Sequence, residues 1–244
     1  MSTEIRIFLA VALAPVIVLL YFIYRKDRKS PEPWGQLLKA FFMGVLSIPI
    51  ALLLTIPLNP CVLWAAQAGD VAAQIADAFF SAAIPEEAAK LLMLWLLLRK
   101  NKYFDEHMDG IVYAVFISMG FAAVENVLYL ADSYDQFIAV GITRALFAVP
   151  GHFCYAILMG YYFSLVKFSS TPSVKNKVLV LLAPVLAHGI YDAILFVSEV
   201  SPMWDSALSM VFIGFCIMMW RYAKRRIEDH LKRDWNENRP HFIA

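Results

Sequence analysis

The chain has 244 residues, of which 61% are hydrophobic and 17% are charged, and its formal net charge is +1. Soluble globular domains usually contain about 25% charged and about 45–50% apolar residues, so the composition excludes an ordinary soluble domain. The small net charge gives no indication of a nucleic-acid partner. The three cysteines, Cys61, Cys154 and Cys216, are far apart and form no CxxC motif, so they predict neither a disulfide framework nor a zinc knuckle.

Seven segments are long and apolar enough to cross a lipid bilayer, which requires roughly 20 mostly apolar residues. These segments are about 4–24, 35–57, 76–98, 109–131, 136–166, 178–198 and 205–222. We expect the first to be a retained helix, because no cleavage site with a polar mature domain follows it. The sequence therefore predicts an all-α, polytopic integral membrane bundle of about seven transmembrane helices.

Two segments depart from a simple spanning pattern. Segment 58–75 is apolar but is interrupted by Pro60 and Gly69, so we interpret it as interfacial rather than as an eighth span. A re-entrant course for this segment is the alternative. Segment 136–166 is long enough to tilt or to contain a break near Pro150.

Lysine and arginine are confined to alternate loops. The loops that carry them are 25–34, 99–108 and 167–177, and the loops between, 58–75, 132–135 and 199–204, contain none. Because basic loops mark the cytoplasmic side, this alternation predicts an extracytoplasmic N-terminus and a cytoplasmic C-terminus. We expect a single bundle over 1–222 and a basic cytoplasmic tail over 223–244, forming a helical extension near anionic headgroups.

Polar side chains inside the predicted spans are few. They are Glu86, Glu87 and Lys90 in the third span, Glu125 and Asn126 in the fourth, Arg144 and His152 in the fifth, and His188 and Asp192 in the sixth. Charged groups inside a bilayer are costly and usually face a functional interior. From their positions along the spans, we expect the acidic and histidine side chains to meet in one layer of the membrane.

The third span has an informative local pattern. Glu86 and Lys90 are four residues apart, so they share a helix face and can pair. Glu87 is rotated about 100° from Glu86, so the two carboxylates have different surroundings. Pro85 should kink or open the helix, which is tolerated at membrane depth where the helix lines a watery cavity.

A carboxylate and a histidine around one water molecule are typical of a hydrolytic site. The carboxylate acts as a general base and the histidine stabilises the oxyanion. A nucleophilic or zincin-like site is not predicted, since GxSxG and HExxH are absent and Cys154 lies on a different helix face from His152. His152 and His188 with a glutamate can still bind zinc from separate helices, so zinc and no metal are equally compatible with the sequence.

Two other functions fit the same residues. Buried Glu, His and Asp also form relays in proton- or metal-coupled transporters, and a non-catalytic membrane partner could retain the scaffold. No inverted repeat is visible and the polar residues occupy four of the seven predicted spans, which favours hydrolysis over transport. We interpret Lys90 and Arg144 as counter-ions rather than catalytic groups.

Four motifs occur in order on successive predicted spans. They are PEEAAK at 85–90, GFAAVEN at 120–126, RALFAVPGH at 144–152 and AHGIYD at 187–192. Over about residues 35–198 this combination resembles the PrsW family of bacterial intramembrane proteases. That family is similar to the wider group of CAAX prenyl endopeptidases and bacteriocin-processing enzymes.

The resemblance implies roles for residues already singled out. One of Glu86 and Glu87 is the general base, His188 is the essential histidine, and Asp192 is its partner. It also implies cleavage of a membrane-anchored protein, such as an anti-sigma factor, as a first cut on the outer side of the bacterial cytoplasmic membrane. The catalytic core is then expected at about 76–198.

The second motif departs from the prenyl endopeptidases. Where they have FxxxH, this chain has Phe121 to Glu125, so a histidine is missing and we expect His152 to supply the second imidazole. The candidate catalytic residues are Glu86, Glu87, Glu125, His152 and His188, and the candidate supporting residues are Lys90, Asn126, Arg144 and Asp192.

Overall fold

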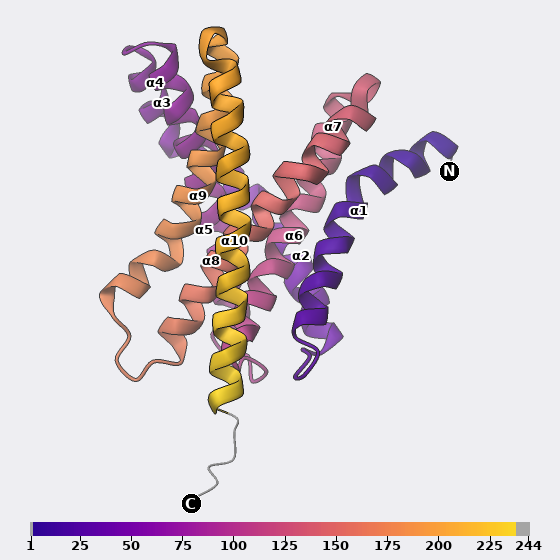
Figure 1. Ribbon diagram of the computed structural model, residues 1–244, viewed down its shortest axis with the longest axis vertical. Helices are drawn as coiled ribbons and strands as arrows, with labels where there is room; N and C mark the ends of the chain where they lie inside the picture. Colours follow the sequence, from indigo (N-terminus) through magenta and orange to yellow (C-terminus); the bar gives the residue numbers. More distant parts are fainter. Residues whose placement is uncertain (1, 238–244) are drawn as a thin grey trace, which may run out of the picture.

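The computed structural model describes residues 2–237, and within that range it contains helices and no strands. The α-helices are α1 Thr3–Lys26, α2 Trp34–Thr55, α3 Asn59–Ala66, α4 Asp70–Asp77, α5 Ile84–Leu98, α6 His107–Asp132, α7 Phe137–Thr143, α8 Val149–Lys167, α9 Val174–Val200 and α10 Asp205–Glu237. Short 3-10 or π segments join them: η1 Ile56–Leu58, η2 Ala78–Ala83, η3 Tyr134–Gln136, η4 Arg144–Ala148 and η5 Pro202–Trp204. The predicted all-α class is confirmed (Figure 1).

Within residues 2–237, six helical runs are long and apolar enough to cross a membrane. They are Thr3–Lys26, Trp34–Ala66, His107–Asp132, Tyr134–Lys167, Val174–Val200 and Pro202–Glu237. The remaining predicted span, 76–98, lies in a helical run formed by α4, η2 and α5. Its helix α5 is as apolar on average as α6, but it carries three charged residues, Glu86, Glu87 and Lys90. The chain is therefore a polytopic helical membrane protein.

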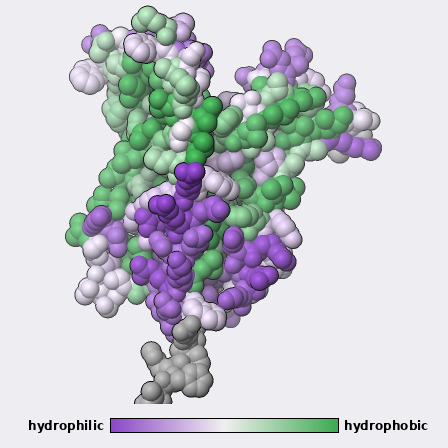
Figure 2. Space-filling view, in the orientation of Figure 1, coloured by the Kyte–Doolittle hydropathy of each residue, from purple (hydrophilic) through white to green (hydrophobic). Residues whose placement is uncertain are grey.

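The loops gather at the two ends of the bundle. Loops 27–33, 99–106 and 168–173 lie at the end where α10 finishes, whereas α3, α4 and the N-terminus lie at the opposite end (Figure 1). Hydrophilic residues concentrate at the first of these ends, which we call the basic end (Figure 2). α3 and α4 pack against each other at the other end, with Gly69 at a positive φ of 117° between them, so segment 58–75 adds no eighth crossing.

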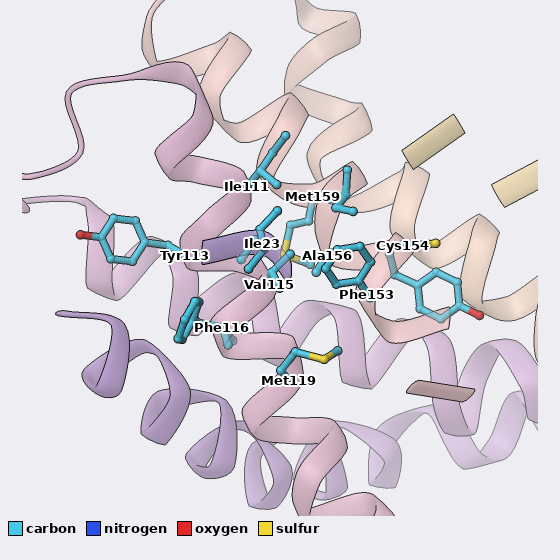
Figure 3. Close-up of a cluster of buried hydrophobic side chains, with 14 of the residues drawn as sticks. Ile23, Ile111, Tyr113, Val115, Phe116, Met119, Phe153, Cys154, Ala156 and Met159 are labelled. Carbon is cyan, nitrogen blue, oxygen red and sulfur yellow. The ribbon is translucent and has the colours of Figure 1, made fainter. Parts of the chain in front are cut away.

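Helix α6 forms the centre of the bundle and is buried along most of its length. α1, α2, α8 and α10 pack around it, and side chains such as Ile23, Met119 and Phe153 interlock in the core (Figure 3). Small residues permit the closest approach: a Cβ atom on Gly44 of α2 would lie 1.9 Å from the carbonyl oxygen of Ile117. Close backbone contact through glycine is the usual basis of helix packing in membranes.

Two π-helical segments stand directly before prolines. η2 precedes Pro85 and η4 precedes Pro150, each in the first turn of the following α-helix. Proline lacks an N–H and clashes with the carbonyl four residues earlier, and a π segment accommodates the misfit without ending the helix. The opening expected at Pro85 and the break expected near Pro150 take this form.

Helix α10 continues without interruption past residue 222 to Glu237, so the expected helical extension is confirmed that far. Residues 238–244 lie outside the described residues. One face of the extension packs on protein rather than on headgroups, burying Ile227, His230 and Asp234. The Asp234 carboxylate accepts hydrogen bonds from the backbone N–H groups of His107 and Met108, at 2.7 and 2.9 Å. α10 thereby caps the start of α6.

Candidate functional site

The nine polar residues selected from the predicted spans join one connected set of contacts, which we call the intramembrane network. Its members are Glu86, Glu87, Lys90, Glu125, Asn126, Arg144, His152, His188 and Asp192. They come from α5, α6, η4, α8 and α9. The expectation that acidic and histidine side chains from four spans meet is confirmed, while their roles in catalysis stay predictions.

Lys90 occupies the middle of the network. Its Nζ lies 2.8 Å from Glu87 Oε1, 3.1 Å from Glu86 Oε2 and 3.3 Å from His152 Nδ1. It also lies 4.0 Å from the centre of the Phe121 ring, a cation–π contact. The ammonium group is buried, so it must be paired, and it contacts both glutamates of the first motif.

His188 bridges two carboxylates on different helices. Its Nδ1 lies 3.0 Å from Glu87 Oε1, and its Nε2 lies 3.1 Å from Asp192 Oδ2. The Tyr155 ring stacks on the imidazole with a centroid separation of 4.8 Å and an interplanar angle of 16°. Both ring nitrogens and one ring face are therefore held by the protein.

His152 is held in a similar way from the other side. Its Nε2 lies 2.7 Å from Glu125 Oε2, which also accepts a hydrogen bond from Arg144 at 2.7 Å. Arg144 donates a second hydrogen bond to Asn126 Oδ1 at 2.6 Å, so the guanidinium fixes the GFAAVEN motif. The centroids of the His152 and His188 rings are 5.4 Å apart, and two carboxylate–imidazole pairs thus flank the Glu86–Glu87 pair.

The network is unevenly buried. The side chains of Glu87 and Lys90 are 1% exposed, whereas those of Glu86 and Glu125 are 16% and 19% exposed. On α5 and α9 the more exposed members, Glu86 and Asp192, lie farther from the basic end than the buried Lys90 and His188. Figure 2 shows the surface hollowed at the opposite end, between the lobe of α3 and α4 and the lobe of α1 and α7.

An apolar groove runs beside the network between α8, α9 and α10. A cavity of about 470 Å³ is lined by Tyr155, Tyr191 and Cys216, among others. A second cavity, of about 260 Å³, shares Tyr191 and continues toward Ser198 near the end remote from the basic loops. Tyr155 lines the first cavity and stacks on His188, while no member of the network lines either cavity, so an apolar segment in the groove would contact Tyr155 rather than the imidazoles themselves.

Comparison with known proteins identifies the family of this chain. The model of the PrsW family of intramembrane metalloproteases matches residues 32–220. The chain belongs to the PrsW family. It is 34% identical to the protease PrsW of Clostridioides difficile (strain 630) over 224 residues, covering 90% of each chain. It is 33% identical to the protease PrsW of Bacillus subtilis (strain 168) over 222 residues, covering 89% of this chain and 93% of the relative.

Membership of the PrsW family makes this protein an intramembrane protease, so the transporter and non-catalytic alternatives are set aside. No solved structure matches the chain. The predicted motifs all lie within the matched residues. The family and the apolar helices together indicate that the protein lies in a lipid bilayer and acts on membrane substrates.

The family description includes a metal, and the donor set alone suits one. Glu86 with Glu125 and His152, and Glu86 with Glu87 and His188, each place ligand atoms within 4.8 Å of one another, and zinc accepts such oxygen and nitrogen donors. The arrangement nevertheless does not fit a dication. The Lys90 ammonium lies among these same ligand atoms, and each nitrogen of both imidazoles already faces a protein group at 2.7–3.3 Å.

Sequence reasoning missed Tyr155. Its hydroxyl is buried and has no hydrogen-bond partner among the described residues, while its ring covers His188. The only available signal was its place one helical turn after His152, on a similar face. Phe121 was noted for its motif, but its contact with the Lys90 ammonium was not foreseen.

Proposed function

We propose that this PrsW-family protease cleaves membrane-anchored proteins with a water molecule activated by Glu86. One observation carries the proposal: Glu86 belongs to both three-residue groups of the network and is partly exposed, while Glu87 is buried beneath Lys90 and His188. A general base must reach the water and the substrate. Glu86 meets this requirement and Glu87 does not.

The proposed reaction is a direct hydrolysis. Glu86 takes a proton from water as the water oxygen bonds to the scissile carbonyl carbon. The resulting oxyanion is stabilised electrostatically by the Lys90 charge and by the imidazoles, whose nitrogens keep their present partners. The C–N bond then breaks, and the proton held by Glu86 passes to the leaving amine, so one water is consumed and a carboxyl and an amino terminus are formed.

The other members of the network act as positioning residues in this proposal. Glu87 and Asp192 hold the two nitrogens of His188, and Glu125 holds His152 under the control of Arg144. Oriented groups of this kind lower the barrier because no reorganisation is needed during the reaction. Asn126 supports Arg144 and is tied to the backbone of Ala12 at 2.9 Å.

The proposed substrate is a membrane-anchored protein such as an anti-sigma factor, cut near the outer surface of the bacterial cytoplasmic membrane. Two features support this choice: the apolar groove beside Tyr155 and the exposure of Glu86 on the side of α5 away from the basic end. An apolar anchor suits the groove, and a partly exposed Glu86 gives water access to the bond.

Orientation can be tested on its own. Reporter fusions after residues 29, 70, 104, 134, 172, 201 and 244 are expected to alternate in, out, in, out, in, out, in, because basic loops stay in the cytoplasm. Two adjacent fusions on the same side would contradict the proposed crossing pattern.

Activity is tested with purified protein in liposomes and a panel of membrane-anchored peptides, with and without a chelator. We expect cleavage of at least one anchored peptide, insensitive to the chelator. The exposed Glu199 offers a matched control: Glu199→Gln should cleave like the wild type, while Glu86→Gln should not. Activity lost to the chelator and restored by zinc would overturn the metal-independent mechanism.

A further inference from the structure

A second group of buried carboxyl groups lies at the basic end, apart from the intramembrane network. Asp27 follows the last residue of α1, Glu106 precedes α6, and Asp109 lies in the first turn of α6. One carboxylate oxygen from each lies within 4.8 Å of the other two. We call these three residues the carboxyl cluster.

Two members of the carboxyl cluster, Asp27 and Asp109, have little charge compensation, while the Glu106 carboxylate accepts a hydrogen bond from the Asp109 backbone N–H. Asp27 and Asp109 are 3% and 1% exposed. Neighbouring Glu32 is also buried; it accepts a hydrogen bond from the Tyr113 hydroxyl and its carboxyl shares a hydrogen bond with that of Asp109. Among residues 2–237, no lysine, arginine or histidine forms an ion pair with Asp27, Glu32 or Asp109. Buried carboxylates without a counter-charge are strongly disfavoured.

Asp27 provides the independent sign of a ligand. Its Oδ2 is buried and has no hydrogen-bond partner among the described residues, and its side chain lines a cavity of about 370 Å³ together with Glu106 and Asp234. Burial, followed by the nearby carboxylates of Glu32, Glu106 and Asp234, raises the pKa of Asp27 to about 8. A cation in the cavity would remove this cost.

Three basic residues, Lys26, Arg28 and Lys29, line the same cavity, and among the described residues none of them forms an ion pair with Asp27. The Lys29 ammonium lies 4.2 Å from the centre of the Trp235 ring, and the Lys26 ammonium lies 5.6 Å from that of Phe22. Asp109 is fixed by accepting hydrogen bonds from the backbone N–H groups of Asp105 and Glu106 at 3.0 and 2.7 Å. Its orientation is therefore set without help from a side-chain cation.

We propose that Asp27, Glu106 and Asp109 bind a hard divalent cation, either Mg²⁺ or Ca²⁺. All the donors are carboxylate oxygens, which these ions prefer. The site contains no sulfur or imidazole ligand, which a softer metal would require. Oxygens within 4.8 Å of one another can surround a Ca²⁺ ion, whose bonds to oxygen are about 2.3–2.6 Å long, whereas Mg²⁺, with bonds of about 2.0–2.1 Å, requires them to lie within about 4.2 Å of one another.

Such a cation has a structural consequence. It joins the end of α1 to the start of α6, where Asp234 of α10 already caps the first N–H groups. Two elements far apart in sequence, α1 and α6, then meet around one ion, beside the contact of α10 with α6. The site is independent of the proposed protease chemistry, since none of its ligands belongs to the intramembrane network.

The test uses full-length protein in detergent, stripped with a chelator, and titrated separately with MgCl₂ and CaCl₂ at constant ionic strength. We expect a saturable rise in Tm of about 2–8 °C and, in equilibrium dialysis, about one ion bound per chain. Saturation by Mg²⁺ at millimolar concentration or by Ca²⁺ at lower concentration identifies the ion. A rise that never saturates, or no rise with either ion, would overturn the site.

Variants connect the effect to these residues. Asp27→Asn should abolish the ion-dependent rise in Tm. Its metal-free Tm should be no lower than that of metal-free wild type, because the buried position, which raises the pKa of Asp27 to about 8, favours a neutral side chain. Glu106→Gln serves as a second variant should Asp27→Asn fail to fold. The exposed neighbour Asp105 is the matched control: Asp105→Asn should keep the full rise. An ion-dependent rise in Tm that is equal in Asp27→Asn, Glu106→Gln and wild type would contradict the proposal.

Discussion

The intramembrane network and the carboxyl cluster are both buried, but their negative charges are balanced differently. In the network, Glu86 and Glu87 contact Lys90, and Glu125 contacts Arg144. In the carboxyl cluster, Asp27 has a buried oxygen without a partner among the described residues. The network therefore carries its own cations and leaves no place for a metal, whereas the cluster requires a proton or an added ion.

The largest effect expected is on the imidazoles of the network. His188→Ala should lower the cleavage rate by about 10²–10⁴-fold, the usual contribution of an acid–base or electrostatic group, and His152→Ala should also impair cleavage strongly. His107→Gln at the basic end is the comparison, and it should retain the wild-type rate when scaled to folded protein. The measurement is the initial rate on an anchored peptide. Equal rates for His188→Ala and His107→Gln would remove His188 from the mechanism.

Lys90 tests the charge balance directly. Lys90→Met leaves Glu87 without its cation and should destabilise the protein by about 3–5 kcal/mol, the typical cost of breaking a buried ion pair. The double variant Lys90→Met/Glu87→Gln should recover part of the lost Tm because it removes the stranded charge. Lys29→Met, at an exposed position, should leave Tm unchanged. A Lys90→Met protein as stable as wild type would show that the network does not depend on this cation.

A smaller effect is expected from filling the groove. Cys216 lines the cavity beside Tyr155, whereas Cys61 lies on α3 at the far end of the molecule. Cys216→Trp should slow cleavage of an anchored peptide by about 10-fold, equivalent to roughly 1.4 kcal/mol of lost binding, while Cys61→Trp should not. The two rates are compared in one liposome preparation. If both variants cleave at the wild-type rate, the substrate does not use this groove.

The contrast between the intramembrane network and the carboxyl cluster also explains which features could be predicted from the sequence. A charged residue in an apolar span is conspicuous, so Glu86, Arg144 and Asp192 could be selected from the sequence alone, and their motifs indicated the family. Helix positions followed from apolar segment lengths, and Pro85 and Pro150 indicated where the spans would be irregular. These signals are strong because lipid tolerates few exceptions.

The carboxyl cluster gave no comparable signal. Aspartate and glutamate in loops are ordinary, and nothing in the sequence predicts that Asp27 meets the segment that carries Glu106 and Asp109. The docking of α10 on the start of α6 was missed for the same reason, since Asp234 is only one charge among many in a basic tail. Tyr155 was overlooked because an aromatic residue in a span is usually packing, and its contact with His188 depends on tertiary structure.

The most direct test of the central claim compares Glu86→Gln with Glu87→Gln in one purified preparation, measuring both the cleavage rate of an anchored peptide and Tm. Glutamine keeps the size of the side chain but cannot accept the proton. We expect Glu86→Gln to lose cleavage by at least about 10²-fold with a nearly unchanged Tm. Glu87→Gln should mainly lower Tm, because it breaks the contacts with Lys90 and His188. A Glu86→Gln protein that cleaves at the wild-type rate would contradict the assignment of Glu86 as the base.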